Sequence, residues 1–130
     1  SYNNTIPIFD TSKKLRKAIM KIKTNSLEPG APKDSTKCSV FKIFQAFGSE
    51  DEILNLNKEY ENGIAWGAAK EELFNLLDEK IKPFRSEYEK ITQDKSYIEK
   101  TLQEGAQKAL SISTPIIEEI RKAIGIKEFK

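Results

Sequence analysis

The feature that most constrains the fold is a long apolar stripe at helical spacing over residues 67–93. Its members recur every three or four positions, and they are Leu73, Leu77, Ile81, Phe84, Tyr88 and Ile91. Charged residues fall mostly off this stripe, as on an amphipathic helix that buries one face. At 1.5 Å per residue such a helix spans roughly 35–40 Å, the width of a small domain. We therefore predict that a helix over 67–93 forms the spine of the fold.

Pro83 lies inside this predicted helix, where it removes one backbone hydrogen bond. The apolar stripe continues beyond it through Phe84 and Tyr88, so one bent helix is favoured over two separate helices. We expect the bend near residues 79–83. Gly63 precedes the helix, as expected where one helix ends in a left-handed turn and the next begins.

The remaining periodic segments predict further helices around the spine. Their ranges are 13–23, 38–47, 49–62 and 95–124. Pro115 either bends the last of these or begins a new helix, because proline suits a first helical position. We find no strand pattern, no repeat and no glycine-rich phosphate loop. The prediction is an all-α fold, a helical bundle of about five helices with long kinked helices near 67–93 and 95–124.

Composition narrows the chemistry that the chain can perform. Its 130 residues include one cysteine and no histidine. The usual zinc sites and the Ser–His or Cys–His nucleophile pairs therefore cannot be assembled, and no metal site is expected. A single cysteine also excludes an internal disulfide, which fits a reducing compartment. No apolar run approaches the ~18 residues of a membrane span. We expect a cytoplasmic protein with no membrane partner.

Positive charge is concentrated in one segment, although the net charge of the chain is only +2. The segment from Thr11 to Leu27 contains no acidic residue, and its cations are Lys13, Lys14, Arg16, Lys17, Lys21 and Lys23. Base rates favour a simple solvated lysine face. The alternative is a surface that contacts phosphates and gives salt-sensitive attraction to nucleic acid.

Three other residues or clusters attract attention but have structural explanations. Cys38 is expected to be a small core or helix-start residue, because the chain offers no base to activate it. Trp66 stands beside glycine turns and is expected to fill space between helices rather than to stack on a ligand. The acidic run at 50–52 suits the positive N-terminus of the helix that begins there.

The order of several short motifs resembles a known family. The opening Ser1–Asn4 looks like the tail of the Lys-Met-Ser-Lys-Ser signature of class I aminoacyl-tRNA synthetases. The rest is similar to the C-terminal part of bacterial-type tryptophanyl-tRNA synthetases. The matching segments are Lys23–Ser26, Tyr60–Gly63, Trp66–Lys70, Pro83–Tyr88, Glu104–Ala109 and Ile120–Gly125. The resemblance covers essentially the whole chain, and it is carried by the order of the motifs.

The resemblance implies a role within a larger enzyme. Members of the family activate tryptophan with ATP and Mg²⁺ and transfer it to tRNA(Trp), commonly as homodimers. Residues 1–10 would be a remnant of the ATP-loop segment, with Ser1 and Asn4 the only ATP-binding remnants. Residues 11–130 would be the helical, anticodon-binding-type domain. The catalytic nucleotide-binding domain is absent from this sequence. We therefore expect a fragment that has no cofactor of its own and is inactive alone.

The cations of the predicted spine are the candidate tRNA-binding residues. Lys82, Arg85 and Lys90 on the spine are predicted tRNA contacts from their charge alone. Asn25 stands where the family often has Asp, so contacts made by an Asp carboxylate are not expected here. The alternative to the family interpretation is a free-standing helical module that docks an acidic protein or binds RNA nonspecifically. We also expect the first helix to pack poorly without the rest of the enzyme.

Overall fold

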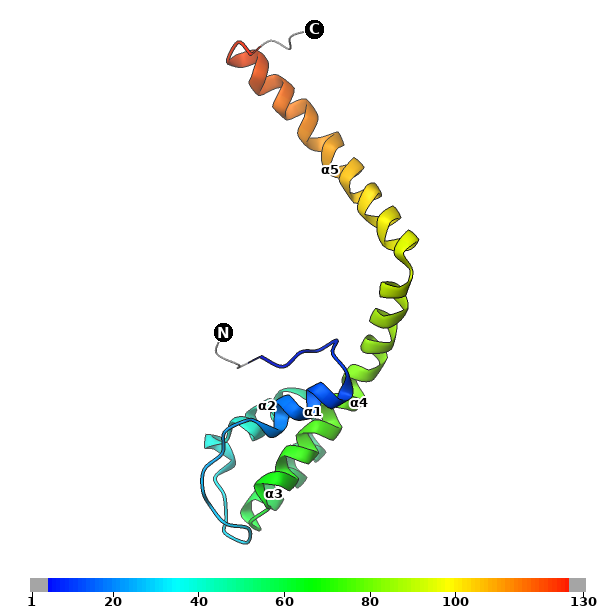
Figure 1. Cartoon of the computed structure of the whole chain (residues 1–130). Coiled ribbons are helices and arrows are strands. Elements are labelled where there is room, and N and C mark those ends of the chain that lie inside the picture. The colour runs from blue at the N-terminus through cyan, green and yellow to red at the C-terminus, as the bar shows by residue number, and fades with distance from the viewer. Residues whose placement is uncertain (1–4, 127–130) are drawn as a thin grey trace. The chain divides into compact units, whose positions relative to one another are not determined.

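The computed structural model describes residues 5–126, which form five α-helices and one short 3-10 helix (Figure 1). The elements are α1 (Ser12–Met20), η1 (Ser35–Lys37), α2 (Ser39–Phe47), α3 (Glu50–Glu61), α4 (Trp66–Gln93) and α5 (Lys95–Ala123). No strand occurs in residues 5–126. The predicted all-α fold is confirmed. The chain divides into two compact units, Ser1–Glu87 and Tyr88–Lys130.

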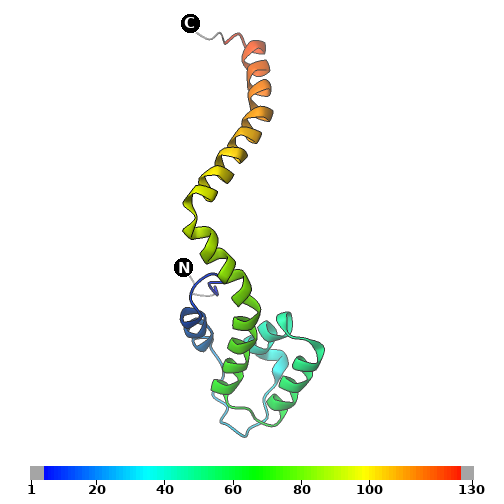
Figure 2. The ribbon, with the colours of Figure 1, turned by 90° about the vertical axis from the view of Figure 1, so that its right-hand side faces the viewer.

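The hydrophobic core belongs to the first unit. Figure 2 shows α1 on one side of the first half of α4 and α3 on the other side. The largest fully buried side chains come from these helices and from α2, and they are Leu15, Ile19, Val40, Tyr60, Leu73 and Leu77. The core therefore lies where α1, α2 and α3 meet the beginning of the predicted spine.

Local capping chemistry explains where the helices begin. The Thr11 hydroxyl accepts the backbone N–H of Lys14 at the start of α1. At α3, the Ser49 hydroxyl accepts the N–H of Glu52, and the Glu52 carboxylate accepts the Ser49 N–H at 2.7 Å. These hydrogen bonds from Ser49 lower the pKa of Glu52. A capping box is therefore present, and the N-terminus of α3 explains the acidic run that follows Ser49, as predicted.

The expectation that the first helix packs poorly is wrong. Leu15 and Ile19 are fully buried against the core. Arg16 forms a two-pronged ion pair with Glu71 of α4, with Nη2–Oε2 at 2.7 Å and Nε–Oε1 at 3.1 Å. Because α4 lies in the same unit and supplies both apolar and polar partners, α1 needs no other domain in order to pack.

The apolar stripe of the spine is buried only in its first half. Leu73 and Leu77 are buried and Ile81 is half-buried, whereas the side chains of Phe84 and Tyr88 are 66% and 45% exposed. α4 continues through Pro83 as one helix, as predicted. The bend near residues 79–83 stays a prediction.

The second unit consists of the end of α4 and α5. α5 continues through Pro115, so the alternative in which this proline begins a new helix is wrong. Nearly all of its side chains are exposed, and Ile98 is half-buried. Gly125 follows α5 with φ 78°, the left-handed conformation that ends many helices.

The loop between α1 and η1 is fastened to the corner between α3 and α4. The Gly30 N–H donates to the Gly63 carbonyl at 2.8 Å, and the Lys33 N–H donates to the Tyr60 carbonyl at 2.8 Å. Gly63 has φ 86°, and a Cβ there would lie 2.4 Å from the carbonyl carbon of Gly30. Position 63 therefore requires glycine both for its backbone conformation and for the close approach of the loop.

Replacing Leu15 with alanine is expected to lower the free energy of unfolding by about 2–5 kcal/mol, because the change leaves a cavity in the core. Urea denaturation followed by circular dichroism measures this. Leu54→Ala, at a position 58% exposed in the same unit, is the control and should change stability by less than about 0.5 kcal/mol. Equal effects of the two variants, or rapid amide exchange over residues 15–19, would contradict the packing of α1.

Gly63→Ala and Gly67→Ala should change stability in opposite directions. The first forces a side chain into a left-handed conformation and against Gly30, so we expect a loss of more than about 1–2 kcal/mol. Gly67 lies in α4 with open space around it, and alanine there should add about 0.5–1 kcal/mol. Thermal melting of the two variants beside the parent chain tests whether the first loses stability and the second gains it.

Candidate nucleic-acid interface

The basic segment forms an exposed stripe of lysines along α1. Lys14 pairs with Asp10 at 2.8 Å, and Arg16 is held by Glu71. The other cations of the segment are exposed and make no ion pair within residues 5–126, and they are Lys13, Lys17, Lys21 and Lys23. Since positions 13, 17 and 21 are four residues apart, their side chains follow one another on one face. We define Lys13, Lys17 and Lys21 as the lysine stripe.

Arg85 does not occupy the surface position that its charge suggested. Its side chain is only 9% exposed, and its Nη1 donates to the Asp78 carboxylate at 2.9 Å. Its Nε and Nη2 are buried with no hydrogen-bond partner within residues 5–126. Asp78 and Arg85 are seven positions apart, which is two helical turns and therefore the same face of α4. Arg85 is therefore a buried residue and not a surface cation.

The other two predicted contacts are exposed but belong to different units. Lys82 lies in the first unit and Lys90 in the second. Arg85 belongs to the first unit with Lys82. Ser1 and Asn4, the predicted ATP-binding remnants, lie outside the described residues.

A buried lysine that sequence reasoning missed holds the loop closed. Lys33 is 4% exposed, and its Nζ donates to the carbonyls of Glu28 and Ala31, each at 2.9 Å. The same ammonium lies 5.4 Å from the centre of the Trp66 ring, a cation–π contact. No local pattern marks this residue, because a lysine beside prolines in a polar loop is usually exposed.

Asn25 fastens the beginning of the same loop. Its Oδ1 accepts the indole N–H of Trp66 at 3.1 Å and the backbone N–H of Leu27 at 3.1 Å. An amide oxygen is sufficient for both bonds, so this position does not need the carboxylate that the family often has. Trp66 is half-buried and packs edge-on against Tyr60, with ring centres 5.8 Å apart. Its predicted position between helices is confirmed.

Cys38 lies at the start of α2 and is buried, as predicted. Its Sγ is 3.4 Å from the hydroxyl of Tyr60. Burial, followed by the contact with Cys38, raises the pKa of the Tyr60 hydroxyl well above its ordinary value. The Tyr60 hydroxyl is therefore neutral over the physiological pH range, and its contact with Cys38 is a polar contact within the core.

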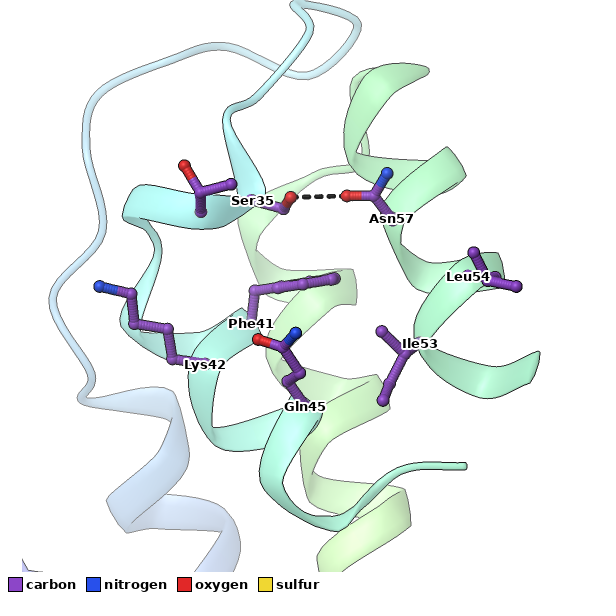
Figure 3. Close-up of a pocket in the computed structure, with 8 residues that line it drawn as sticks. Ser35, Phe41, Lys42, Gln45, Ile53, Leu54 and Asn57 are labelled. Carbon is purple, nitrogen blue, oxygen red and sulfur yellow. Dashed lines mark hydrogen bonds between the residues drawn. The ribbon is translucent and has the colours of Figure 1, made fainter. Parts of the chain in front are cut away.

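Two hollows of opposite electrostatic character flank α3. The α2–α3 pocket has a volume of about 350 Å³ and is shown in Figure 3; it is lined by Ser35, Thr36, Phe41, Lys42, Gln45, Ile53, Leu54 and Asn57. The α3–α4 groove, of about 610 Å³, includes four glutamates in its lining: Glu52, Glu59, Glu72 and Glu79. The residues that line the α2–α3 pocket include no carboxylate, in contrast to those that line the α3–α4 groove. Polyanions are therefore compatible with the pocket and are repelled by the groove.

Residues 5–126 contain no candidate metal site and no candidate membrane-spanning helix. In that range no His, Cys, Asp and Glu side chains gather into a group of three or more that could hold a metal ion. None of the helices in the described part is both long enough and apolar enough to cross a membrane.

Comparison with known proteins finds relatives along the whole chain. It is 38% identical over 130 residues to a tryptophan–tRNA ligase of Pseudomonas syringae pv. tomato, and 40% identical to that of Pseudomonas aeruginosa. In both cases it spans 29% of the relative's length. The ligase of Neisseria meningitidis is 38% identical, and the chain spans 39% of it. No protein-family model matches.

Solved structures agree with the sequence relatives. A tryptophanyl-tRNA synthetase from Campylobacter jejuni, in complex with ADP and tryptophan, superposes with a TM-score of 0.90 at 34% identity. The match covers 95% of this chain and 39% of that one. The sequence and fold matches agree on one family and on the region that the resemblance indicated. The chain therefore belongs to the tryptophan–tRNA ligase family and corresponds to its C-terminal region.

Proposed function

We propose that this chain is the tRNA-binding region of an enzyme that activates tryptophan with ATP and charges tRNA(Trp). The chain spans only 29–39% of the length of the three ligases named above, so the reaction belongs to the intact enzyme. In that enzyme, tryptophan, ATP and Mg²⁺ bind outside this sequence, apart from an ATP-loop remnant at residues 1–10 that includes Ser1 and Asn4. The intact enzyme is proposed to be a cytoplasmic homodimer.

The observation that carries this proposal is the lysine stripe. Lysines that are already ion-paired release few counterions when a phosphate approaches, whereas unpaired exposed lysines attract nucleic acid strongly at low salt. Lys13, Lys17 and Lys21 have no ion-pair partner within residues 5–126 and share one face of α1. Because α1 packs firmly on α4, the stripe is presented by a fixed element and not by a loose terminal segment. A fixed array of cations suits the regular phosphates of a folded RNA.

The cations of the spine take different roles in this proposal. Lys82 and Lys90 are exposed and are proposed to contact the tRNA backbone. Arg85 is buried against Asp78, so its effect on tRNA is expected to pass through the fold of α4 and not through a direct contact. Residues 11–130 are proposed to form the helical anticodon-binding domain.

Removing the lysine stripe tests the proposed function. The triple variant Lys13→Ala, Lys17→Ala, Lys21→Ala should bind tRNA(Trp) less tightly, and the slope of log affinity against log salt should fall by about 2–3. Fluorescence anisotropy over 50–200 mM salt measures both quantities. A second triple variant, Lys58→Ala, Lys95→Ala, Lys108→Ala, removes the same charge from exposed positions outside α1. If both variants weaken binding equally, net charge is sufficient and the stripe is not the interface.

The 130-residue chain is expected not to catalyse ATP–pyrophosphate exchange with tryptophan. In this family the exchange requires the signature lysines and a nucleotide-binding domain, which this sequence does not contain. A radiolabelled pyrophosphate assay, run beside an intact tryptophan–tRNA ligase as a positive control, provides the measurement. Exchange by the chain alone would show that adenylate chemistry resides in its helices and would overturn the assignment of roles proposed above.

A further inference from the structure

We propose that the α2–α3 pocket binds one unstacked nucleobase of the tRNA anticodon loop, and that the Gln45 amide pairs with the edge of that base. This inference rests on the proposed function, because it assumes that the ligand is tRNA. It adds a definite position for base recognition, which the lysine stripe cannot supply because phosphate contacts carry no sequence information.

The floor and walls of the pocket suit the apolar faces of a planar ring. Figure 3 shows Phe41 in the middle of the pocket, between the Ser35–Asn57 pair and the side chains of Gln45 and Ile53. Phe41 is held in place by Tyr60, with ring centres 5.3 Å apart in an edge-on arrangement. The volume of about 350 Å³ lies at the lower end of the usual range for ligand pockets, about 300–1,000 Å³. Such a space is large enough for a single base.

Gln45 is the polar group of the pocket that has spare hydrogen-bonding capacity at both ends of its amide. It is exposed on α2 and has no side-chain hydrogen bond to any of residues 5–126. Asn57, by contrast, already accepts from the Ser35 hydroxyl at 2.5 Å and donates to Glu61 at 2.7 Å. In Figure 3 the Gln45 amide lies next to the Phe41 side chain, and Ile53 stands across from it. It therefore presents a donor and an acceptor side by side to whatever enters.

An amide of this kind complements the bases of the expected anticodon. tRNA(Trp) carries the anticodon CCA. Cytosine and adenine each present an amino donor next to a ring-nitrogen acceptor on the pairing edge. The amide oxygen of Gln45 can accept from the amino group while its NH₂ donates to the ring nitrogen. Sequence-specific RNA recognition generally uses this edge of bases that are splayed out of single-stranded loops.

The charges around the pocket favour RNA over a peptide with basic residues. Lys42 lies at the rim, and Figure 3 shows its ammonium directed away from the centre, where a phosphate next to the bound base would pass. No carboxylate is present among the residues that line the pocket. The carboxylates of Asp34 and Glu61 adjoin it, but they accept hydrogen bonds from Thr36 and Asn57. The glutamate-lined α3–α4 groove would repel the same ligand.

The experiment measures anticodon preference in the 130-residue chain. The affinity for tRNA with the CCA anticodon is compared with the affinity for the same tRNA with that anticodon replaced, at 50 and 200 mM salt. Gln45→Ala, and separately Gln45→Glu, should reduce the preference by about tenfold or more, because one bidentate base contact is lost. Lys42→Ala should weaken binding to both tRNAs equally and reduce the salt slope by about one.

Asn75→Ala is the matched control, since it removes an exposed amide from the α3–α4 groove. It should leave both affinities unchanged. Gln45 is exposed, so its variants should melt at the temperature of the parent chain. Gln45→Glu keeps the size of the side chain. An effect shared by both variants therefore cannot result from the smaller size of alanine.

Three results would overturn the pocket proposal, and they separate it from the proposed function. If the parent chain binds tRNA(Trp) no better than an unrelated RNA of equal length, the proposed function fails and the pocket proposal fails with it. If tRNA binds without anticodon preference, only the pocket proposal fails. If a preference exists and survives both Gln45 variants, base readout occurs elsewhere on the molecule and the pocket is not its site.

Discussion

The contact between the loop and the corner of α3 and α4 is the constraint on which the first unit depends. Gly30 approaches Gly63 so closely that no side chain fits between them, and Lys33 is buried beside this contact. Burying an ammonium group is costly unless its protons are hydrogen-bonded. Lys33 meets that requirement with backbone carbonyls of its own loop and with the face of Trp66. An opened loop would lose these partners together, which makes the closed form cooperative.

The fastened loop in turn positions the recognition surfaces. One residue after Lys33, η1 begins with Ser35, which bonds to Asn57 of α3. η1 leads into α2 through Cys38, which contacts Tyr60. The α2–α3 pocket therefore owes its shape to a loop that is short of apolar residues but well supplied with hydrogen bonds. Positive and negative charges lie on different parts of this unit. Unpaired cations lie on α1, and carboxylates line the α3–α4 groove. An RNA that approaches the unit meets attraction and repulsion on different surfaces.

Much of this fold could be predicted because its signals are local. The Ser49–Glu52 capping box, Gly48 after α2, and the periodic apolar residues of α1 to α4 depend only on near neighbours in the chain. The misjudged residues depend on distant ones. Arg85 carries the same charge as Lys82, and only the folded structure shows that Asp78 and the surrounding chain bury it. Lys33 gives no periodic signal at all. The burial of Leu15 could be predicted from the pattern, but the identity of its partner helix could not.

The candidate site was predictable to the same limited extent. The cations of α1 are evident in the sequence because no acidic residue lies among them. Which of them form ion pairs is not evident from the sequence. Arg16 and Lys14 turn out to be neutralised by Glu71 and Asp10, which leaves a narrower stripe. The α2–α3 pocket could not be predicted from the sequence, because its walls come from η1, α2 and α3 and each contributes only two or three side chains.

The exposure of α5 has a consequence for the calorimetry of this chain. The heat capacity of unfolding arises mainly from apolar surface that becomes newly hydrated, at about 12–15 cal/mol/K per residue in ordinary globular proteins. The side chains of α5 are already hydrated in the folded state, apart from half-buried Ile98. Melting this helix adds little to the change in heat capacity. The measured value should therefore correspond to a protein nearer in size to the first unit than to the whole chain.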